Sequence, residues 1–207
     1  MAIFKIVLTL PAWQDKIIRQ VIKEEEKENP NDELLEKAKN ACIKTKDENF
    51  MFAFAYYTYN PRNRREIVQV LLNRNAKKWA IPCVKEIKSE LLNNSLVIIQ
   101  ELCINALIKD KGYEELYALA KVIGHNDRIL DYLIENNKIH LVMDYAKNVE
   151  GCDFPKVSKF INTFLSGMER SVRVEYQQRF DKICRRKVKK SKSLNESLRL
   201  MGEDMEK

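Results

Sequence analysis

The chain has 207 residues, of which 45% are hydrophobic and 32% charged, and its formal net charge is +7. A compact domain of this length buries about 70% of the surface of its unfolded chain, so its core needs neither metals nor disulfides. Only five Gly and five Pro occur. This scarcity argues against an all-β sandwich or barrel, because the many tight turns of those folds consume both residue types.

The first quarter of the chain predicts a series of helices. Residues 3–10 are apolar and fit either a strand or a buried helix, because periodicity does not separate the two. Apolar residues at helical spacing then run from Trp13 to Ile22, and an acidic run ends that helix. Asp32 is predicted to cap the second helix and Asp47 the third. The inner side of the second helix is predicted to carry Leu34, Leu35, Ala38, Ala41 and Cys42.

Residues 50–59 are apolar on every side, which is typical of a helix that is buried all round. A central strand is the competing interpretation, since Phe50, Phe52 and Phe54 also alternate. We favour the helix because the neighbouring segments are helical and Ala is a poor strand former.

The next segment contains several start and stop signals for helices. Asn60 followed by Pro61 predicts a helix start, with a capping residue and then Pro at the first helical position. Pro82 is predicted to mark the first turn of a helix or a kink. Ser95 is expected to cap a strongly apolar helix that Gly112 closes as a C-cap.

Beyond Gly112 the predicted helices become shorter. Residues 113–123, 128–135 and 139–149 are separated by Gly or Asn breaks, which is typical of helical hairpins packed in series. Asp153 starts a further helix, and a last long helix follows it. The inner stripe of that last helix is predicted to be Val172, Tyr176, Phe180 and Ile183.

These signals together predict an all-α protein of about ten helices, stacked as antiparallel hairpins in an α-solenoid-like array. Because no clean repeat period runs through the chain, an irregular helical bundle is the alternative. Residues 1–190 are predicted to form a single helical domain, which could be a fragment of a longer chain. Residues 191–207 are predicted to form a basic and polar C-terminal tail.

One segment supports the stacked arrangement by resemblance. Gly112 is followed by Tyr113, Glu114, Glu115 and Leu116, and two short helices come after Asn126. In this opening and in the helices after it, residues 112–148 resemble the helical repeats of clathrin heavy chains and vacuolar-sorting proteins. The resemblance implies a solenoid scaffold without catalytic residues.

The sequence contains no recognisable catalytic or metal-binding motif. Glycine-rich phosphate loops, zinc-protease motifs and nucleophile elbows are missing. The cysteines form no C-x-x-C pair and are expected to be reduced structural thiols, while His125 and His140 are interpreted as a turn residue and a helix-face residue. We therefore expect no catalytic residue, no metal and no cofactor, and a cytoplasmic location with the nucleus as the alternative.

No apolar run in the sequence approaches the roughly 20 residues that are needed to span a membrane.

A basic cluster after the apolar helix is the first candidate for a contact site. Single-stranded nucleic acid needs cations for its phosphates and aromatic planes for its bases. Tyr56, Tyr57, Tyr59 and Trp79 flank the cluster and could provide the planes. The alternative is a solvated helix face beside buried aromatic side chains. The cluster comprises Arg62, Arg64, Arg65, Arg74, Lys77 and Lys78.

A second basic cluster lies near the C-terminus. A solvated helix end is the simplest interpretation, since cations suit the negative end of the helix dipole. A nuclear import signal or nucleic-acid arm, and a contact with an anionic membrane surface, are the other two. The cluster comprises Arg185, Arg186, Lys187, Lys189 and Lys190.

The functional prediction follows from the fold class and from the missing motifs. A protein–protein interaction scaffold or adaptor of helical-repeat type, without catalysis, is favoured, with another protein as its partner. A nucleic-acid-associated, RNA-binding helical protein is the alternative, using the basic segment 62–79 and the basic C-terminal helix. An anionic membrane surface is the less favoured third partner.

Overall fold

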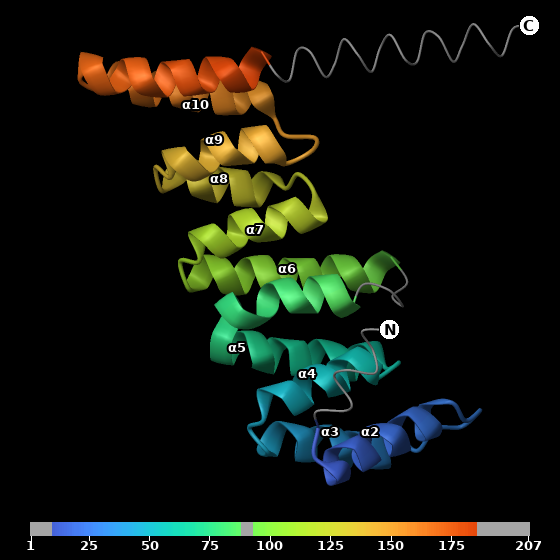
Figure 1. Cartoon of the computed structure of the whole chain (residues 1–207). Coiled ribbons are helices and arrows are strands. Elements are labelled where there is room, and N and C mark those ends of the chain that lie inside the picture. The colour runs from blue at the N-terminus through green and yellow to red at the C-terminus, as the bar shows by residue number, and fades with distance from the viewer. Residues whose placement is uncertain (1–9, 88–92, 186–207) are drawn as a thin grey trace, which may run out of the picture. The chain divides into compact units, whose positions relative to one another are not determined.

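The computed structural model describes residues 10–87 and 93–185, and these residues form helices and turns with no strand among them. The all-α fold class is therefore confirmed (Figure 1). The chain was predicted to hold one helical domain over residues 1–190; its contacts divide it into two compact units, Met1–Ile123 and Gly124–Lys207. Most of the predicted segment 3–10, the predicted tail 191–207 and the basic residues after Arg185 lie outside the described residues.

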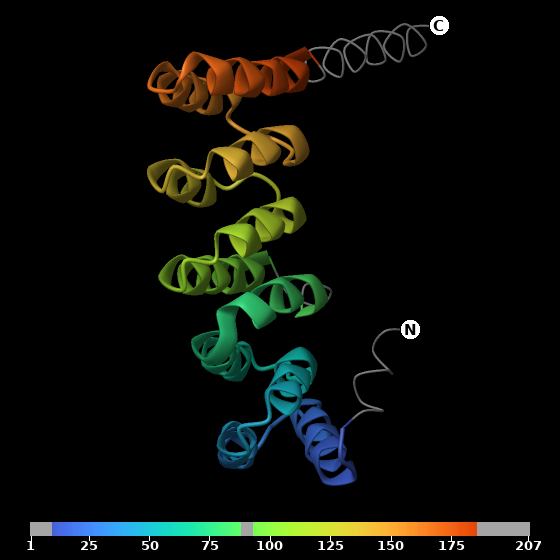
Figure 2. The same ribbon diagram turned by 60° about the vertical axis from the view of Figure 1, so that its left-hand side comes forward.

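The first unit is a stack in which helices pack in chain order (Figures 1 and 2). Each helix packs against its neighbour in the chain, and α2, α3 and α5 also pack against the next helix but one. This is the packing expected of stacked helical hairpins, where neighbours bury each other's apolar faces. The helices of this unit are α2 (Ala12–Glu25), α3 (Asp32–Lys44), α4 (Glu48–Tyr57), α5 (Pro61–Glu86), α6 (Asn93–Lys109) and α7 (Tyr113–Ile123).

Helix α4 is the centre of the first unit, and every residue from Phe50 to Tyr56 is buried. The favoured helical interpretation of this segment is confirmed. The predicted cap is confirmed as well, because the Asp47 carboxylate accepts hydrogen bonds from the backbone N–H groups of Asn49 (3.0 Å) and Phe50 (3.2 Å). A helix that is apolar all round needs cover on all sides, and α2, α3 and α5 supply it.

The acidic run at the end of α2 ties that helix to the turn between α4 and α5. The Glu25 carboxylate accepts a hydrogen bond from the Thr58 hydroxyl (2.5 Å) and others from the backbone N–H groups of Tyr59 (2.6 Å) and Asn60 (3.3 Å). A carboxylate suits this place because it lies at the positive N-terminus of α5. At least this member of the acidic run therefore has a structural role.

Helix α5 begins where predicted, with Asn60 as its cap and Pro61 in its first turn. The prediction for Pro82 is wrong, since this residue lies inside the helix and the break falls at Asn75 (φ −157°, ψ 81°). The side chain of Asn75 accepts a hydrogen bond from the backbone N–H of Lys78 (3.1 Å), as an N-cap does. A capping side chain, and not the missing N–H of proline, therefore interrupts this helix.

Three further boundaries differ from the prediction by a few residues. Asn31, and not Asp32, caps α3, and its side chain accepts from the N–H of Leu34 (3.0 Å). Helix α6 begins at Asn93, ahead of the predicted cap Ser95. The left-handed residue after α6 is Lys111 (φ 51°), while Gly112 donates its N–H to the carbonyl of Leu107 (2.8 Å).

Gly112 lies in a tight space and has no left-handed backbone. A Cβ at this position would lie 3.1 Å from both the Leu107 side chain and the Glu115 carboxylate. Gly112, predicted as the C-cap of this helix, is instead explained by the close approach of the Leu107 and Glu115 side chains.

The second unit contains α8 (Asp127–Glu135), α9 (Ile139–Asn148) and α10 (Phe154–Ser166), followed by helical residues from 170 to 185. Helix α9 packs against both α8 and α10. Asn126 caps α8, and Asp153 caps α10 at the start that the sequence predicts.

A buried tyrosine anchors the start of α8 to α9. The hydroxyl of Tyr145 accepts a hydrogen bond from the backbone N–H of Asn126 (2.9 Å) and lies 3.1 Å from Nδ1 of His125. Burial raises the pKa of Tyr145 to about 12, so the hydroxyl stays protonated at neutral pH. His125 is a turn residue with a structural contact, as predicted.

The last described helix buries only part of its predicted stripe. Phe180 and Ile183 are buried, and the ring of Phe180 stacks on that of Phe154 with 5.5 Å between centroids. Val172 is 40% exposed, so its prediction as an inner residue is wrong. Residues 171–175 are all exposed, because nothing in the described part of the chain covers this first part of the helix.

None of the five cysteines is paired in a disulfide, and Cys42, Cys83 and Cys103 are buried while Cys152 and Cys184 are half-buried. Burial raises the pKa of Cys42 and of Cys83 to about 12 and that of Cys103 well above its usual value. A thiol reagent at pH 8 should therefore modify Cys152 and Cys184 first and the other three only after unfolding.

The same shifts predict a loss of stability in alkali. Unfolded thiols ionise from about pH 9, whereas the buried ones keep their protons, so the unfolded state binds fewer protons and is favoured as pH rises. At pH 10 the thiols of Cys42 and Cys83 should each cost about 1 kcal/mol of unfolding free energy. Urea midpoints at pH 8 and pH 10 measure this loss, and a Cys83→Ala variant should show a smaller one. Equal losses in both proteins would contradict the assignment.

Candidate functional site

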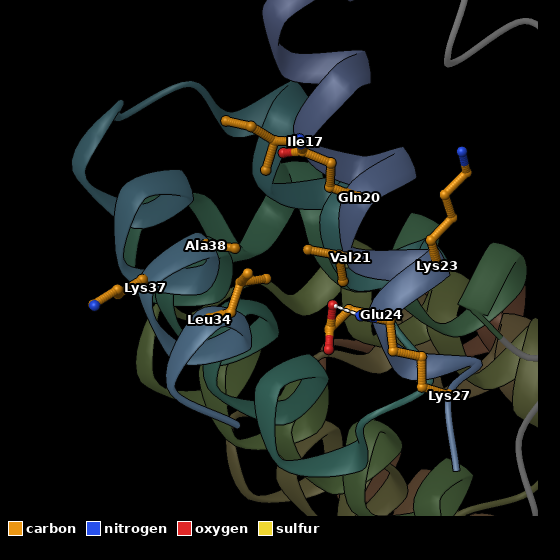
Figure 3. A pocket seen from close by; sticks show the side chains of 9 residues that line it. All are labelled: Ile17, Gln20, Val21, Lys23, Glu24, Lys27, Leu34, Lys37 and Ala38. Atoms are coloured by element: carbon orange, nitrogen blue, oxygen red, sulfur yellow. Dashed lines mark hydrogen bonds and ion pairs between the residues drawn. The ribbon is translucent and has the colours of Figure 1, made fainter. Parts of the chain in front are cut away.

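A groove lies between α2 and α3 on the surface of the first unit, with a volume of about 580 Å³. We call it the α2–α3 groove. Ile17 and Val21 form an apolar row one helical turn apart on α2, and Leu34 and Ala38 form the matching row on α3. Figure 3 shows Val21 and Leu34 pointing toward one another across it. The groove also includes Gln20, Lys23, Glu24, Lys27 and Lys37.

The one carboxylate in the groove is neutralised by its neighbours. Glu24 accepts a hydrogen bond from Nζ of Lys27 (2.7 Å) and another from the backbone N–H of Asn31 (3.0 Å). Both hydrogen bonds lower the pKa of Glu24, and the bond from Lys27 has the larger effect. The groove therefore offers an apolar floor in which the only negative charge is already paired.

Two lysines at the edges give the groove an excess of positive charge. Lys23 on α2 and Lys37 on α3 are exposed and flank it from opposite sides (Figure 3). Lys37 pairs with Glu33 at 2.6 Å, but the side chains of both are more than 70% exposed. An ion pair in water contributes at most about 1 kcal/mol, so Lys37 can exchange this partner for another.

The apolar surface at the groove is exposed and continues beyond it on α2. Leu34 in the groove is 41% exposed, and Trp13, one turn before Ile17, is 52% exposed. The ring of Trp13 packs edge-on against the buried Phe50, with 5.6 Å between centroids. Apolar side chains are thus left in water on two adjacent helices, which on soluble proteins often marks an interaction site.

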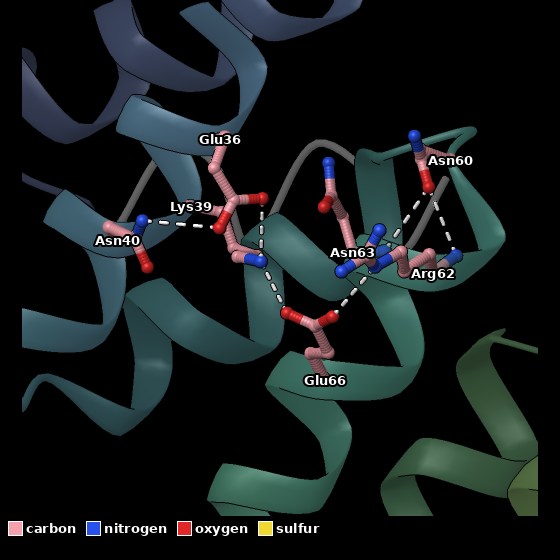
Figure 4. Close-up of polar contacts among 7 residues, drawn as sticks. All are labelled: Glu36, Lys39, Asn40, Asn60, Arg62, Asn63 and Glu66. Atoms are coloured by element: carbon pink, nitrogen blue, oxygen red, sulfur yellow. Dashed lines mark hydrogen bonds and ion pairs between the residues drawn. The ribbon is translucent and has the colours of Figure 1, made fainter. Parts of the chain in front are cut away.

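A second hollow lies between α3 and the start of α5, and a network of charged contacts beside it has a structural role (Figure 4). Lys39 is 3% exposed and its ammonium lies between the carboxylates of Glu36 (2.8 Å) and Glu66. Arg62 donates to the other oxygen of Glu66 (3.1 Å). Hydrogen bonds from Lys39 are the largest cause lowering the pKa values of both carboxyls. The network joins α3 to α5.

Arg64, predicted as a contact residue, is buried and holds the end of α4. Its Nε donates to the backbone carbonyl of Ala55 (3.0 Å), and its terminal nitrogen donates to that of Thr58. A helix leaves its last carbonyls unpaired and its C-terminus partially negative. The guanidinium of Arg64 donates hydrogen bonds to these carbonyls and places a positive charge at the helix C-terminus. Arg64 therefore does not belong to an accessible cationic surface.

The other predicted cations of residues 62–79 are exposed, and three of them make contacts. Besides Arg62, Arg74 donates to the carbonyl of Lys46 (2.9 Å) and Lys78 pairs with Glu48 (2.7 Å). Arg65 and Lys77 are exposed. The cluster is therefore divided between structural contacts and free surface.

The aromatic planes predicted beside this cluster are mostly inside the protein. Tyr56 and Trp79 are buried, and Trp79 stacks on Phe52 with 5.0 Å between ring centroids. Its indole N–H donates to Glu48 (2.9 Å). Tyr57 is half-buried and Tyr59 is exposed. The buried rings cannot stack on bases without unfolding α4 and α5.

Of the predicted C-terminal cluster, only Arg185 lies within the described residues, where it is exposed. Arg186, Lys187, Lys189 and Lys190 lie outside them. His140, predicted as a helix-face residue, lies 2.8 Å from the hydroxyl of Tyr176. Among the described residues no group of three or more His, Cys, Asp or Glu is placed to hold a metal ion.

Comparison of the chain with protein-family models, curated proteins and solved structures finds no match. The resemblance of residues 112–148 to clathrin-type repeats therefore stays a prediction. Over the described ranges, no helix has both the length and the apolar character to cross a membrane.

Proposed function

We propose that the chain is a non-catalytic protein–protein interaction scaffold or adaptor that contacts its partner at the α2–α3 groove. The supporting observation is the groove itself. Leu34 remains 41% exposed although the next residue, Leu35, is 2% exposed and fills the core. The apolar row of Leu34 is thus not needed to build the first unit, and its exposure carries a cost in solubility that a binding partner would remove.

Nucleic-acid binding is the second candidate, because Arg65, Lys77 and Arg185 are exposed and available to phosphates. It has weaker support than the groove. Arg64 is engaged by backbone carbonyls, and Tyr56 and Trp79 are buried, so one predicted cation and two predicted base platforms are missing from the surface. Cysteines that form no disulfide are in keeping with a cytoplasmic or nuclear protein.

The two candidates differ in their response to salt. We expect the full chain to leave heparin and single-stranded RNA at low salt while it keeps a protein partner after nuclease treatment. Loss of that partner from a Leu34→Asp variant, with retention by Val97→Asp, would support the groove, since Val97 is an exposed aliphatic residue on another helix. Tight RNA binding that falls steeply with salt, and partner capture that nuclease abolishes, would favour the second candidate.

A further inference from the structure

We propose that the α2–α3 groove binds an amphipathic helix that is acidic on the sides of its apolar face. This inference rests on the proposed scaffold function and names the kind of partner segment that the groove fits. It combines the shape of the floor with the charge of the edges.

The shape of the floor favours a helix as the occupant. Ile17 and Val21 on one side and Leu34 and Ala38 on the other are each spaced by four residues, so both rows run along their helices. A third helix laid between such rows can insert residues spaced three and four apart. Trp13 lies one turn before Ile17 on α2 and is exposed, so the apolar positions of α2 extend over about two turns.

The charge of the edges favours acidic flanks. Three lysines and one glutamate line the groove, and the glutamate is already occupied by Lys27 and by the N–H of Asn31. Lys37 also has the exposed partner Glu33, which a carboxylate of an occupant can replace. Lys23 and Lys37 therefore face an occupant from opposite edges. Carboxylates beside the apolar face of a bound helix would pair with both, and a basic helix would be repelled by both.

Two other occupants fit the charge less well. The apolar segment Met1–Leu10 of this chain carries Lys5 and no carboxylate, so it does not complement the lysines. A second copy of the chain docking by the same groove would bring like charges together in a two-fold contact. Both remain as outcomes of the test.

The test uses three labelled synthetic peptides of about 18 residues, a length that spans about 27 Å as a helix. The first has Leu at positions three and four apart with Glu on the flanks, the second has Lys in place of each Glu, and the third is a scramble of the first. Fluorescence anisotropy with the full chain should show that the first binds at least about tenfold more tightly than the others. Its affinity should fall as salt is raised.

Matched variants assign the binding to the groove. Leu34→Asp, and Lys23→Glu with Lys37→Glu, should each weaken binding of the first peptide at least about tenfold. Two controls should leave it unchanged: Val97→Asp, and Lys77→Glu with Lys85→Glu, all at exposed positions away from the groove. Unaltered urea midpoints would establish that the groove variants remain folded.

Four results would overturn the inference. The basic peptide could bind as well as the acidic one, or none of the peptides could bind. Self-association that Leu34→Asp abolishes would identify a second copy as the occupant. A tenfold or larger gain in affinity on changing Ile3 and Ile6 to Asp would identify the chain's own first segment. The proposed function fails separately, if nuclease-resistant partner capture is unaffected by Leu34→Asp.

Discussion

Replacing Arg64 by Ala should destabilise the first unit by about 3 kcal/mol, because it removes charged hydrogen bonds to two backbone carbonyls at the buried end of α4. Arg64 is only 4% exposed, so water cannot replace the guanidinium without opening the structure. Arg64→Lys should lose about half as much, since an ammonium keeps the charge but not the two-pronged geometry. The measurement is the urea midpoint by tryptophan fluorescence, which reports this unit because Trp13 and Trp79 both lie in it.

The neighbouring residue provides the matched control. Arg65 is exposed, and Arg65→Ala should change the unfolding free energy by less than about 0.5 kcal/mol. Midpoints of Arg64→Ala and Arg65→Ala that agree within error would contradict the capping role of Arg64 and would return it to the accessible basic cluster.

Replacing Phe54 by Ala should cost about 3–5 kcal/mol, the range for a large aromatic side chain removed from a packed core. Phe54 is 1% exposed and lies on a helix that is buried on every side, so few neighbours can move to fill the cavity. The loss should appear as a lower urea midpoint with an unchanged slope.

Tyr59 is the control for this second prediction, because it belongs to the same aromatic segment but is 51% exposed. Tyr59→Ala should cost less than about 1 kcal/mol. A similar loss for both variants would contradict the central position of α4.

The helix order could be predicted from the sequence because several helices carry their own start signal. Asp47, Asn60 and Asp153 all accept hydrogen bonds from the first turn of the helix they were predicted to cap. Such caps are local, so the residues that specify them lie within a few positions of one another. The Pro82 prediction failed because a cap at Asn75 overrides proline as the place of the break.

The role of the basic segment could not be predicted, because it depends on contacts between helices. Arg64 and Arg65 are adjacent and chemically identical, yet one is buried against α4 and the other is exposed. Helical spacing turns adjacent residues about 100° apart, but only the position of the neighbouring helix decides which of them is covered.

The α2–α3 groove was missed for a related reason. Leu34 and Leu35 were both predicted to face inward, whereas only Leu35 does. A signal was available in the sequence, since Leu34, Ala38 and Ala41 form a second apolar row beside the row of Leu35 and Cys42. The row of Leu35 and Cys42 is buried, so the row of Leu34 is the one left at the surface.

The most direct test of whether the α2–α3 groove is the binding surface is hydrogen–deuterium exchange. It compares the full chain alone with the full chain bound to its co-purified protein partner. We predict slower exchange of backbone amides in α2 and α3 on binding, with little change over residues 62–79. Protection confined to residues 62–79 or to the basic C-terminal residues, with α2 and α3 unchanged, would contradict the groove as the binding surface.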